Sequence, residues 1–507
     1  MLRSFTMGFL LVILSISTAL AQIKLPALIS NNLVLQQNTK VALWGWANPG
    51  EKVSITTSWN NKTTNVTTDP LGKWSTKVKT TKAGGPYTIK FKASNEQAVT
   101  NVLLGEVWLA SGQSNMEFFL AKTRSSSYTG AINWDEEVKN ANYPMIRQID
   151  VANKNAGDPQ TDFKGEWKIC SPQTADTFSA VAYFFAVQIH KQTGYPVGII
   201  NSTWGGTTAE SWTAKEVLAA DPDLNVTLTR WDSAVAAYPA ASEKFTTALA
   251  AWKLDSLNKA KPIAPTRPNP DKAPVRLYNA MIAPLRPYTL RGVIWYQGES
   301  NAPRAWQYRK LFPAMIENWR NDFANKKLPF YFVQLSPHRS ENGEIRDAQV
   351  YTYRTVPYTG MAVTTDNGDS LDIHPRNKKL VGDRLALWAL HNEYGKKDVV
   401  YSGPLYKSSR TVGNKIRIKF DFVDGGLVAK DGELKEFTIA GDDQVFVAAK
   451  ALIEGDEIVV WSEGVVKPAA VRFAWKAVPH PNLFNKSGLP ASPFRTDEWE
   501  YVSKGKN

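Results

Sequence analysis

The fold is decided by residues 105–117, which read Gly105-Glu106-Val107-Trp108-Leu109-Ala110-Ser111-Gly112-Gln113-Ser114-Asn115-Met116-Glu117. The apolar run from Val102 to Ala110 predicts a buried strand, and Ser111-Gly112 predicts a turn after it. This arrangement aims the Ser114 hydroxyl out of a sheet edge, beside the backbone N–H groups of the next turn. An acyl-transfer nucleophile needs such an exposed oxygen with donors nearby, so Ser114 is a candidate nucleophile. Taken alone, the stretch also fits an ordinary Ser/Asn turn.

The composition is typical of a soluble globular protein, with 43% hydrophobic and 21% charged residues. The length of 507 residues exceeds a single hydrophobic core, so we expect about two to four domains. The formal net charge is +13, but Lys and Arg are scattered, and we expect no nucleic-acid partner. The single cysteine, Cys170, excludes an intramolecular disulfide and a cysteine-rich metal site.

The first 21 residues have the pattern of a signal peptide. Arg3 supplies a positive charge, residues 7–16 are apolar, and Ala19-Leu20-Ala21 is a small-residue cleavage site before Gln22. No later segment has about 18 uninterrupted apolar residues, so we expect no membrane span. The sequence therefore predicts an exported protein, periplasmic or extracellular, cleaved near Ala21.

Three regions with different patterns follow the predicted signal peptide. Residues 22–100 contain short alternating strands separated by Gly, Pro and Asn turns, which favours a β-sandwich. Residues 101–395 alternate strands and helices and predict an α/β catalytic domain with a mostly parallel sheet. Within this domain, segments 120–178 and 213–275 are expected to be irregular loops and lids. Residues 396–507 return to strands and predict a C-terminal β-rich domain with a loop-rich tail.

Polar motifs follow several of the strands predicted in the α/β region. They come after Ala110, Ile200 and Tyr296. Ligand and catalytic sites in parallel sheets form at the carboxyl ends of the strands. We therefore expect these three motifs to lie together.

A serine nucleophile needs a base, which is nearly always histidine, and the chain contains five histidines. The predicted positions of four argue against this role: two end helices, one lies in a polar loop and one in the tail (His190, His391, His338, His480). His374 follows a predicted strand at 360–364, precedes a predicted helix, and has Asp369 and Asp372 nearby. We expect His374 to be the base and the rate to rise through an ordinary histidine pKa of about 6.5.

Candidate donors for an oxyanion lie in the same motifs. They are the N–H of Ser114, an N–H from Gly205 or Gly206, and a side-chain amide from Gln297 or Asn301. Gln297 directly follows the strand 292–296, so the sheet fixes its position. We therefore prefer Gln297 as the donor and expect Asn301 to support the loop or contact sugar.

The motifs resemble those of the SGNH hydrolases and, more narrowly, of the sialate O-acetylesterase family. The similar blocks are Gly112-Gln113-Ser114-Asn115-Met116, Trp204-Gly205-Gly206-Thr207, Trp295-Tyr296-Gln297-Gly298-Glu299-Ser300-Asn301 and Ile373-His374-Pro375. The similarity extends to residues 32–36, 278–282 and 489–497, which span nearly the whole chain after the signal peptide. It implies a three-layer, flavodoxin-like SGNH core with a parallel sheet, flanked by N- and C-terminal β-sandwich-like units.

The resemblance also implies a carbohydrate O-acetylesterase with Ser114 as nucleophile and His374 as base, and with no metal or organic cofactor. The expected partner is an acetylated sugar. Many SGNH enzymes place the acid three residues before the histidine, and that position is Leu371 here. The orienting group therefore stays open between Asp372, which we prefer, Asp369 and a backbone carbonyl.

Residues in and near the motifs are expected to contact the substrate. They are Gln113, Asn115 and Glu299 in the motifs and the lid residues Glu210, Trp212 and Arg276, which flank segment 213–275. The motifs do not separate a sialate esterase from an esterase of acetylated plant polysaccharide such as xylan. A carbohydrate-binding protein with an inactive core is a further alternative, which the 18 Trp residues would suit.

Overall fold

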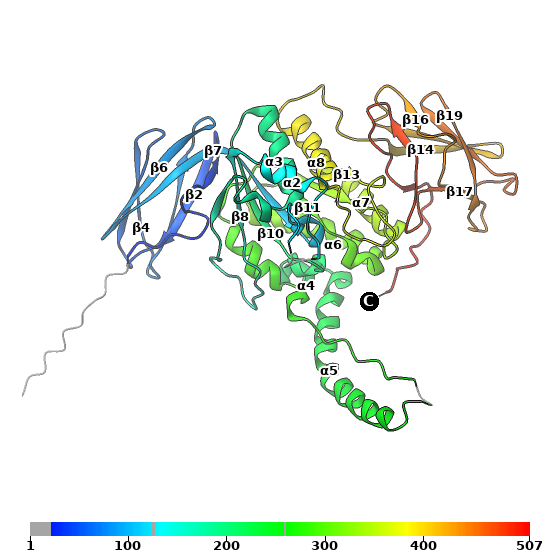
Figure 1. Cartoon of the computed structure of the whole chain (residues 1–507), viewed down its shortest axis with the longest axis horizontal. Coiled ribbons are helices and arrows are strands. Elements are labelled where there is room, and N and C mark those ends of the chain that lie inside the picture. Colours follow the sequence, from blue (N-terminus) through cyan, green and yellow to red (C-terminus); the bar gives the residue numbers. More distant parts are fainter. Residues whose placement is uncertain (1–21, 124–126, 258–259, 507) are drawn as a thin grey trace, which may run out of the picture.

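The computed structural model describes residues 22–123, 127–257 and 260–506. An N-terminal β unit, a central α/β region and a C-terminal β unit follow one another along the long axis of the molecule (Figure 1). The predicted signal peptide, residues 1–21, lies outside the described residues. Among the helices of the described part, none is long and apolar enough to cross a membrane.

The central sheet has the strand order β13-β12-β11-β7-β10-β8-β9. All neighbouring strands along it are parallel except β8 and β9, which pair antiparallel at one edge. The strands are β7 (Glu96–Gly112), β8 (Tyr143–Asp150), β9 (Trp167–Cys170), β10 (Val197–Thr203), β11 (Gly292–Tyr296), β12 (Phe330–Gln334) and β13 (Thr359–Val363). The expected α/β fold class with a parallel sheet is confirmed.

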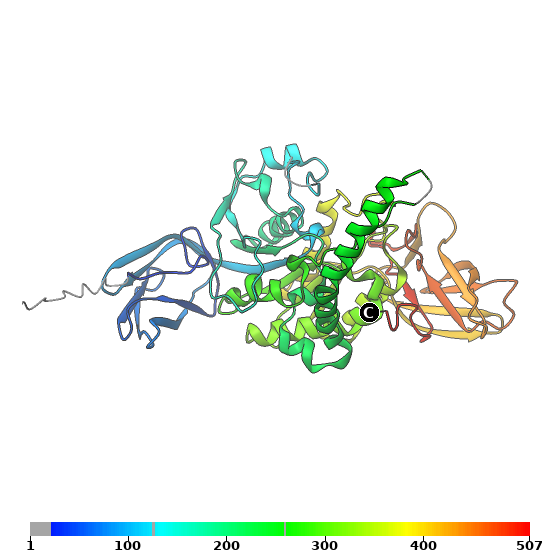
Figure 2. The same cartoon turned by 90° about the horizontal axis from the view of Figure 1, so that it is seen from below.

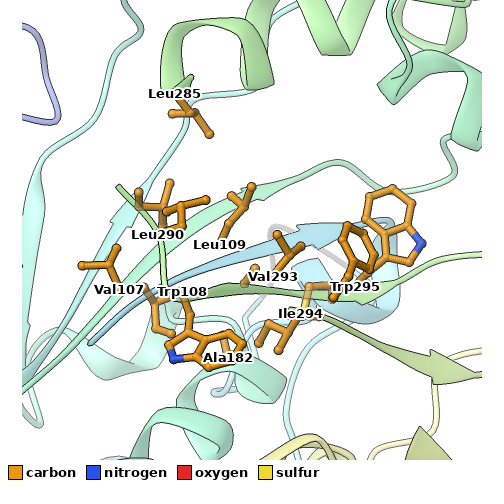
Figure 3. Close-up of a cluster of buried hydrophobic side chains, with 14 of the residues drawn as sticks. Val107, Trp108, Leu109, Ala182, Leu285, Leu290, Val293, Ile294 and Trp295 are labelled. Carbon is orange, nitrogen blue, oxygen red and sulfur yellow. The ribbon is translucent and has the colours of Figure 1, made fainter. Parts of the chain in front are cut away.

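Both faces of this sheet are covered, which is why strands β10, β11 and β12 are buried at every position and do not alternate between buried and exposed residues. Trp108 contacts Phe185 of α3 on one face, and Trp295 contacts Phe312 of α6 on the other. Figure 3 shows Trp108 and Trp295 on opposite sides of the neighbouring strands β7 and β11. The main helices are α3 (Ala180–Thr193), α6 (Ala305–Asp322), α7 (Gly343–Thr355) and α8 (Lys378–Glu393).

Strand β7 connects the N-terminal unit to the central sheet. Its first half pairs antiparallel with β6, and its second half pairs parallel with β10 and β11. The other N-terminal strands are β1 (Val34–Gln36), β2 (Lys40–Trp46), β3 (Lys52–Thr57), β4 (Lys62–Thr67), β5 (Lys73–Lys79) and β6 (Gly84–Lys92). The expected domain boundary at residues 100 and 101 therefore falls inside one continuous strand.

The C-terminal unit contains two four-stranded sheets, β14-β15-β20-β19 and β18-β17-β21-β23, and a short pair, β16-β22. Their inward side chains form a hydrophobic cluster separate from the central core. The strands are β14 (Leu405–Val412), β15 (Lys415–Asp421), β16 (Leu427–Ala429), β17 (Phe437–Ala440), β18 (Val447–Ala448), β19 (Lys450–Glu454), β20 (Glu457–Trp461), β21 (Ala470–Phe473), β22 (Leu483–Asn485) and β23 (Phe494–Arg495).

Two segments that the sequence predicts to be irregular contain regular structure. Segment 120–178 contributes β8 and β9 to the sheet, and segment 213–275 contains α5 (Pro222–Leu254), a helix of 33 residues. Helix α5 projects from the body of the molecule (Figures 1 and 2). Only Leu224 and Thr227 of α5 are buried, so it carries no strong apolar stripe for the sequence to reveal.

The remaining helices are short. They are α1 (Ser114–Glu117), α2 (Trp134–Lys139), α4 (Lys215–Ala220) and the tighter or wider turns η1 (Ala175–Thr177), η2 (Ala209–Trp212), η3 (Pro270–Lys272), η4 (Tyr278–Ile282), η5 (Ala283–Leu285) and η6 (Glu299–Arg304). Helix α1 directly follows β7, η2 follows β10 and η6 follows β11. The polar motifs therefore lie on the first turns after the three central strands.

Candidate active site

The three central strands end side by side, and this places the polar motifs together. Gly112 of β7 is in register with Thr203 of β10 and with Tyr296 of β11. Its φ is +136°, and a Cβ at this position would lie 2.2 Å from the Tyr296 carbonyl oxygen. Only glycine fits this strand end, so Gly112 allows the chain to turn sharply into α1.

Ser114 is the first residue of α1 and lies 2.7 Å, Oγ to Nε2, from His374. The two residues are 260 positions apart in the chain, and the loop between β13 and α8 brings His374 to the serine. Ser114 is 5% exposed, and His374 is half-buried. The sequence prediction that Ser114 and His374 meet at the carboxyl edge of the sheet agrees with this geometry.

The surroundings of His374 keep its imidazole neutral. Burial, followed by the nearby positive charge of Lys378, lowers the His374 pKa to about 4, while Asp372 acts in the opposite direction. The Tyr128 ring lies 5.1 Å from the His374 ring, centroid to centroid. A neutral imidazole is the form that accepts the Ser114 proton, so the pair has the protonation state of a nucleophile and its base.

Neither expected acid hydrogen-bonds to the His374 ring. Asp372 Oδ1 is 3.7 Å from His374 Nδ1, beyond hydrogen-bond distance, and accepts instead from the His374 backbone N–H at 2.8 Å. Asp369 accepts from the Leu371 N–H at 2.7 Å. Both carboxylates therefore shape the loop, and no residue that the structure describes forms a hydrogen bond with Nδ1. Asp372 as an orienting group for the ring itself is not supported.

The backbone N–H groups near Ser114 differ in whether they already donate a hydrogen bond within the protein. The Ser114 N–H begins α1 and has no acceptor within the helix. The Gly205 N–H donates to Glu117 Oε2 at 2.6 Å. Gly206 has a φ of +69°, and a Cβ there would lie 2.9 Å from Lys272 Nζ. Of the two glycines, Gly206 is the better candidate donor.

The structure does not support the preference for Gln297 as an oxyanion donor. Gln297 is fully buried, and its Nε2 donates to Asn301 Oδ1 at 2.7 Å and to the Thr207 carbonyl at 3.2 Å. The Ala209 N–H donates to Asn301 Oδ1 at 2.9 Å, which fixes the orientation of both amides. Gln297 and Asn301 therefore brace the turns after β10 and β11.

The residues expected to contact substrate within the motifs are buried. Gln113 is 3% exposed and accepts from the Ser300 N–H at 3.3 Å. Asn115 is 1% exposed and donates to Glu299 Oε1 at 2.6 Å. The structure therefore does not support these substrate contacts, because these side chains already form hydrogen bonds within the protein. The three residues support the site from behind.

Two of the three expected lid contacts are also buried. Trp212 is fully buried and donates through Nε1 to Thr207 Oγ1 at 2.9 Å. Glu210 is 3% exposed and pairs with Arg230 of α5 at 3.0 Å, which anchors the base of that helix. Arg276 is half-buried and keeps its place as a candidate substrate contact.

Glu117 is a site residue that the sequence interpretation missed. It lies one helical turn after Ser114, so both side chains share a face of α1. Its Oε2 accepts from the Gly205 N–H and from the Tyr128 hydroxyl, the latter at 3.2 Å, and burial raises the Glu117 pKa. In the sequence, the spacing of three residues between Ser114 and Glu117 is the signal that could have identified Glu117 as a site residue.

A second missed residue is Lys378, the first residue of α8. It is fully buried, and its Nζ donates to Asn115 Oδ1. Burial lowers the Lys378 pKa to about 7, against the effect of Glu299. A single lysine next to an exposed one, Lys379, gives no sequence signal of burial.

A large cavity lies away from these residues, at the amino ends of the parallel strands. It has a volume of about 1240 Å³, and its lining includes Glu106, Arg291 and Tyr394. Ser114 and His374 are not among its lining residues. We therefore locate the candidate site by the nucleophile and its base, and not by the size of the cavity.

Comparison with known proteins finds similarity to carbohydrate esterases. Residues 266–391 match the family model of carbohydrate esterases described as sialic acid-specific acetylesterase. The sialate O-acetylesterase of Mus musculus is 32% identical over 429 residues, which cover 75% of each chain. That of Homo sapiens is 29% identical over 522 residues, covering 92% of this chain and 91% of the human protein.

A solved structure is similar over almost the whole chain. It is a carbohydrate acetylesterase from Xanthomonas citri, with 36% identity and a TM-score of 0.80. The match covers 94% of this chain and all of the other, 100%. With this fold, this site and these relatives, the chain belongs to the sialate O-acetylesterase family of carbohydrate esterases.

Proposed function

We propose that this protein is a carbohydrate O-acetylesterase that removes acetyl groups from the hydroxyls of sialic acids. The observation that carries the proposal is the 2.7 Å contact between Ser114 Oγ and His374 Nε2 at the carboxyl edge of the sheet. The relatives named as sialate O-acetylesterases support the substrate class.

The reaction begins when Ser114 Oγ attacks the acetyl carbonyl carbon while His374 Nε2 takes the hydroxyl proton. The negative charge that forms on the carbonyl oxygen is held by the N–H groups of Ser114 and Gly206. The carbon–oxygen bond to the sugar then breaks, and His374 returns its proton to the sugar alcohol. His374 next takes a proton from water, whose oxygen attacks the acetyl carbon. The bond between this carbon and Ser114 Oγ then breaks, His374 gives the proton to Ser114 Oγ, and acetate leaves.

The test is acetate release from an O-acetylated sialic acid by the wild-type protein and by Ser114→Ala. We expect the variant to fold normally and to lose on the order of a thousandfold or more in kcat. His374→Ala should lose about as much, and the double variant little more, because the pair acts as a unit. An active Ser114→Ala variant would overturn the proposal.

Acetylated polysaccharide is a second candidate substrate. The relative from Xanthomonas citri, 36% identical, is named as a carbohydrate acetylesterase without a sialate substrate. Parallel assays on O-acetylated sialic acid and on acetylated xylan, with equal acetyl ester concentrations, separate the two. A higher kcat/KM on xylan would replace sialate as the substrate and leave the Ser114 chemistry in place.

We also propose that the protein is exported and cleaved near Ala21. The pattern of Arg3, the apolar residues 7–16 and Ala19-Leu20-Ala21 supports this proposal. Mass spectrometry of the mature N-terminus, from cells that express the full chain, should find Gln22. A retained Met1 in the purified protein would contradict export.

A further inference from the structure

The side chain of Asn115 lies buried where four segments meet. Its Nδ2 donates to Glu299 Oε1 at 2.6 Å and to the Ile373 carbonyl at 2.9 Å. Its Oδ1 accepts from Lys378 Nζ. The residue after the nucleophile is thus tied to η6, to the loop that carries His374, and to α8.

Lys378 places a cationic group in the interior behind Ser114. Its Nζ lies 4.5 Å from the Phe118 ring centroid and 5.4 Å from that of Tyr296. Burying a charged group costs free energy unless hydrogen bonds or opposite charge compensate. Here Asn115 accepts the hydrogen bond, and the buried Glu299 supplies nearby negative charge.

In the part of the chain that the structure describes, no carboxylate hydrogen-bonds to the His374 ring, whereas a carboxylate usually orients a catalytic histidine. Asp372 is 3.7 Å from Nδ1, and it bonds to the loop backbone instead. The position of the ring is therefore set by the position of its loop. The hydrogen bond between Asn115 and the Ile373 carbonyl is the contact that joins this loop to the residue next to Ser114.

We propose that Lys378 is a positioning residue of the esterase, which orients Asn115 so that Asn115 holds the His374 loop against the Ser114 turn. The inference rests on the proposed roles of Ser114 and His374. Lys378 acts through Asn115 and touches neither substrate nor reacting atoms. The Lys378–Asn115–Ile373 connection thereby does the positioning work that a triad acid does elsewhere.

The charge of Lys378 also provides a second test of the proposed role, because it affects the His374 pKa. The charged or titratable groups that act on His374 are Lys378, Asp372 and His338, and Tyr128 packs on its ring. Lys378 disfavours a second positive charge on the imidazole, so removing it raises the His374 pKa. The acid limb of the pH profile must then move to higher pH.

The experiment compares Lys378→Met with Lys379→Met in the full-length protein on one acetyl ester. Lys379 is the neighbouring exposed lysine, paired with Asp383 at 2.5 Å, and its variant should behave as wild type. We expect Lys378→Met to lose on the order of a hundredfold in kcat with KM within about threefold, because the reacting pair is misplaced. The acid limb of kcat/KM should also move up in pH. Wild-type kcat with an unmoved acid limb would overturn the inference.

A double variant covers the case in which Lys378→Met fails to fold because Glu299 is left as an uncompensated charge. Lys378→Met with Glu299→Gln removes both charges, a change that proteins often tolerate. A low kcat in this folded variant supports positioning through Asn115, and a wild-type kcat overturns it. An inactive Ser114→Ala beside a fully active Lys378→Met would contradict this inference alone, whereas an active Ser114→Ala would contradict the proposed function itself.

Discussion

At the scale of single residues, the protonation of His374 determines the pH range of the reaction. The base must be neutral, so activity is present above the His374 pKa and lost as the pH falls through it. Burial and Lys378 bring this pKa to about 4. We therefore expect kcat/KM to stay level from about pH 7 down to about pH 5 and to fall near pH 4, measured with a stable acetyl ester.

This expectation replaces the limb near pH 6.5 that an ordinary histidine would give. The sequence identifies His374 but carries no signal of how deeply the fold buries the ring or of Lys378 beside it. A halving of kcat/KM at about pH 6.5 would show that the imidazole is solvated and that the packing around it is looser than described.

Gln297 shows how a residue can be found correctly and assigned the wrong role. Its amide bonds to Asn301 and to the Thr207 carbonyl, so Gln297→Ala should reduce the free energy of unfolding by about 1–3 kcal/mol. Urea unfolding combined with steady-state kinetics measures both effects. If Gln297→Ala kept the wild-type free energy of unfolding but raised the activation barrier for acetate release by about 3 kcal/mol, Gln297 would again be the preferred oxyanion donor.

At the scale of elements, the turn from β7 into α1 depends on Gly112. A Cβ there would meet the Tyr296 carbonyl at 2.2 Å, with φ at +136°. Gly112→Ala should cost more than about 2 kcal/mol of stability and displace Ser114, so thermal unfolding and acetate release should both fall. Gly464→Ala is the matched control, because a Cβ at Gly464 meets no heavy atom within 4 Å. Equal melting temperatures for both variants would contradict this account of the turn.

The strands that form the site are predictable because β7, β10 and β11 are apolar runs followed by polar turns. Strand β8 is not, because Arg147 and Gln148 are buried within it. Arg147 donates to Asn101 Oδ1 of β7 at 3.0 Å, and Gln148 donates to Asp150 Oδ1 within β8 at 2.8 Å. These buried polar residues interrupt the apolar pattern by which the sequence would reveal the strand. The same cause hides Lys378 and Asn115.

At the scale of the whole molecule, strand β7 runs without interruption from the N-terminal unit into the catalytic sheet. Its pairing with β6 continues directly into its pairing with β10 and β11. We expect the amides of β6 and of the central sheet to lose protection in one step when hydrogen exchange is followed in increasing urea. Exchange of β6 at much lower urea would show that the two regions open independently.

The central claim, that Ser114 is the nucleophile, is tested most directly by mapping a covalent label. The purified protein is treated with an organophosphonate that carries a leaving group, digested, and analysed by mass spectrometry. Ser114 lies 2.7 Å from a neutral histidine, so we predict one adduct per chain, on the peptide that contains Ser114, and none in Ser114→Ala. A stoichiometric adduct on a different residue, or an unchanged adduct in Ser114→Ala, would contradict the account.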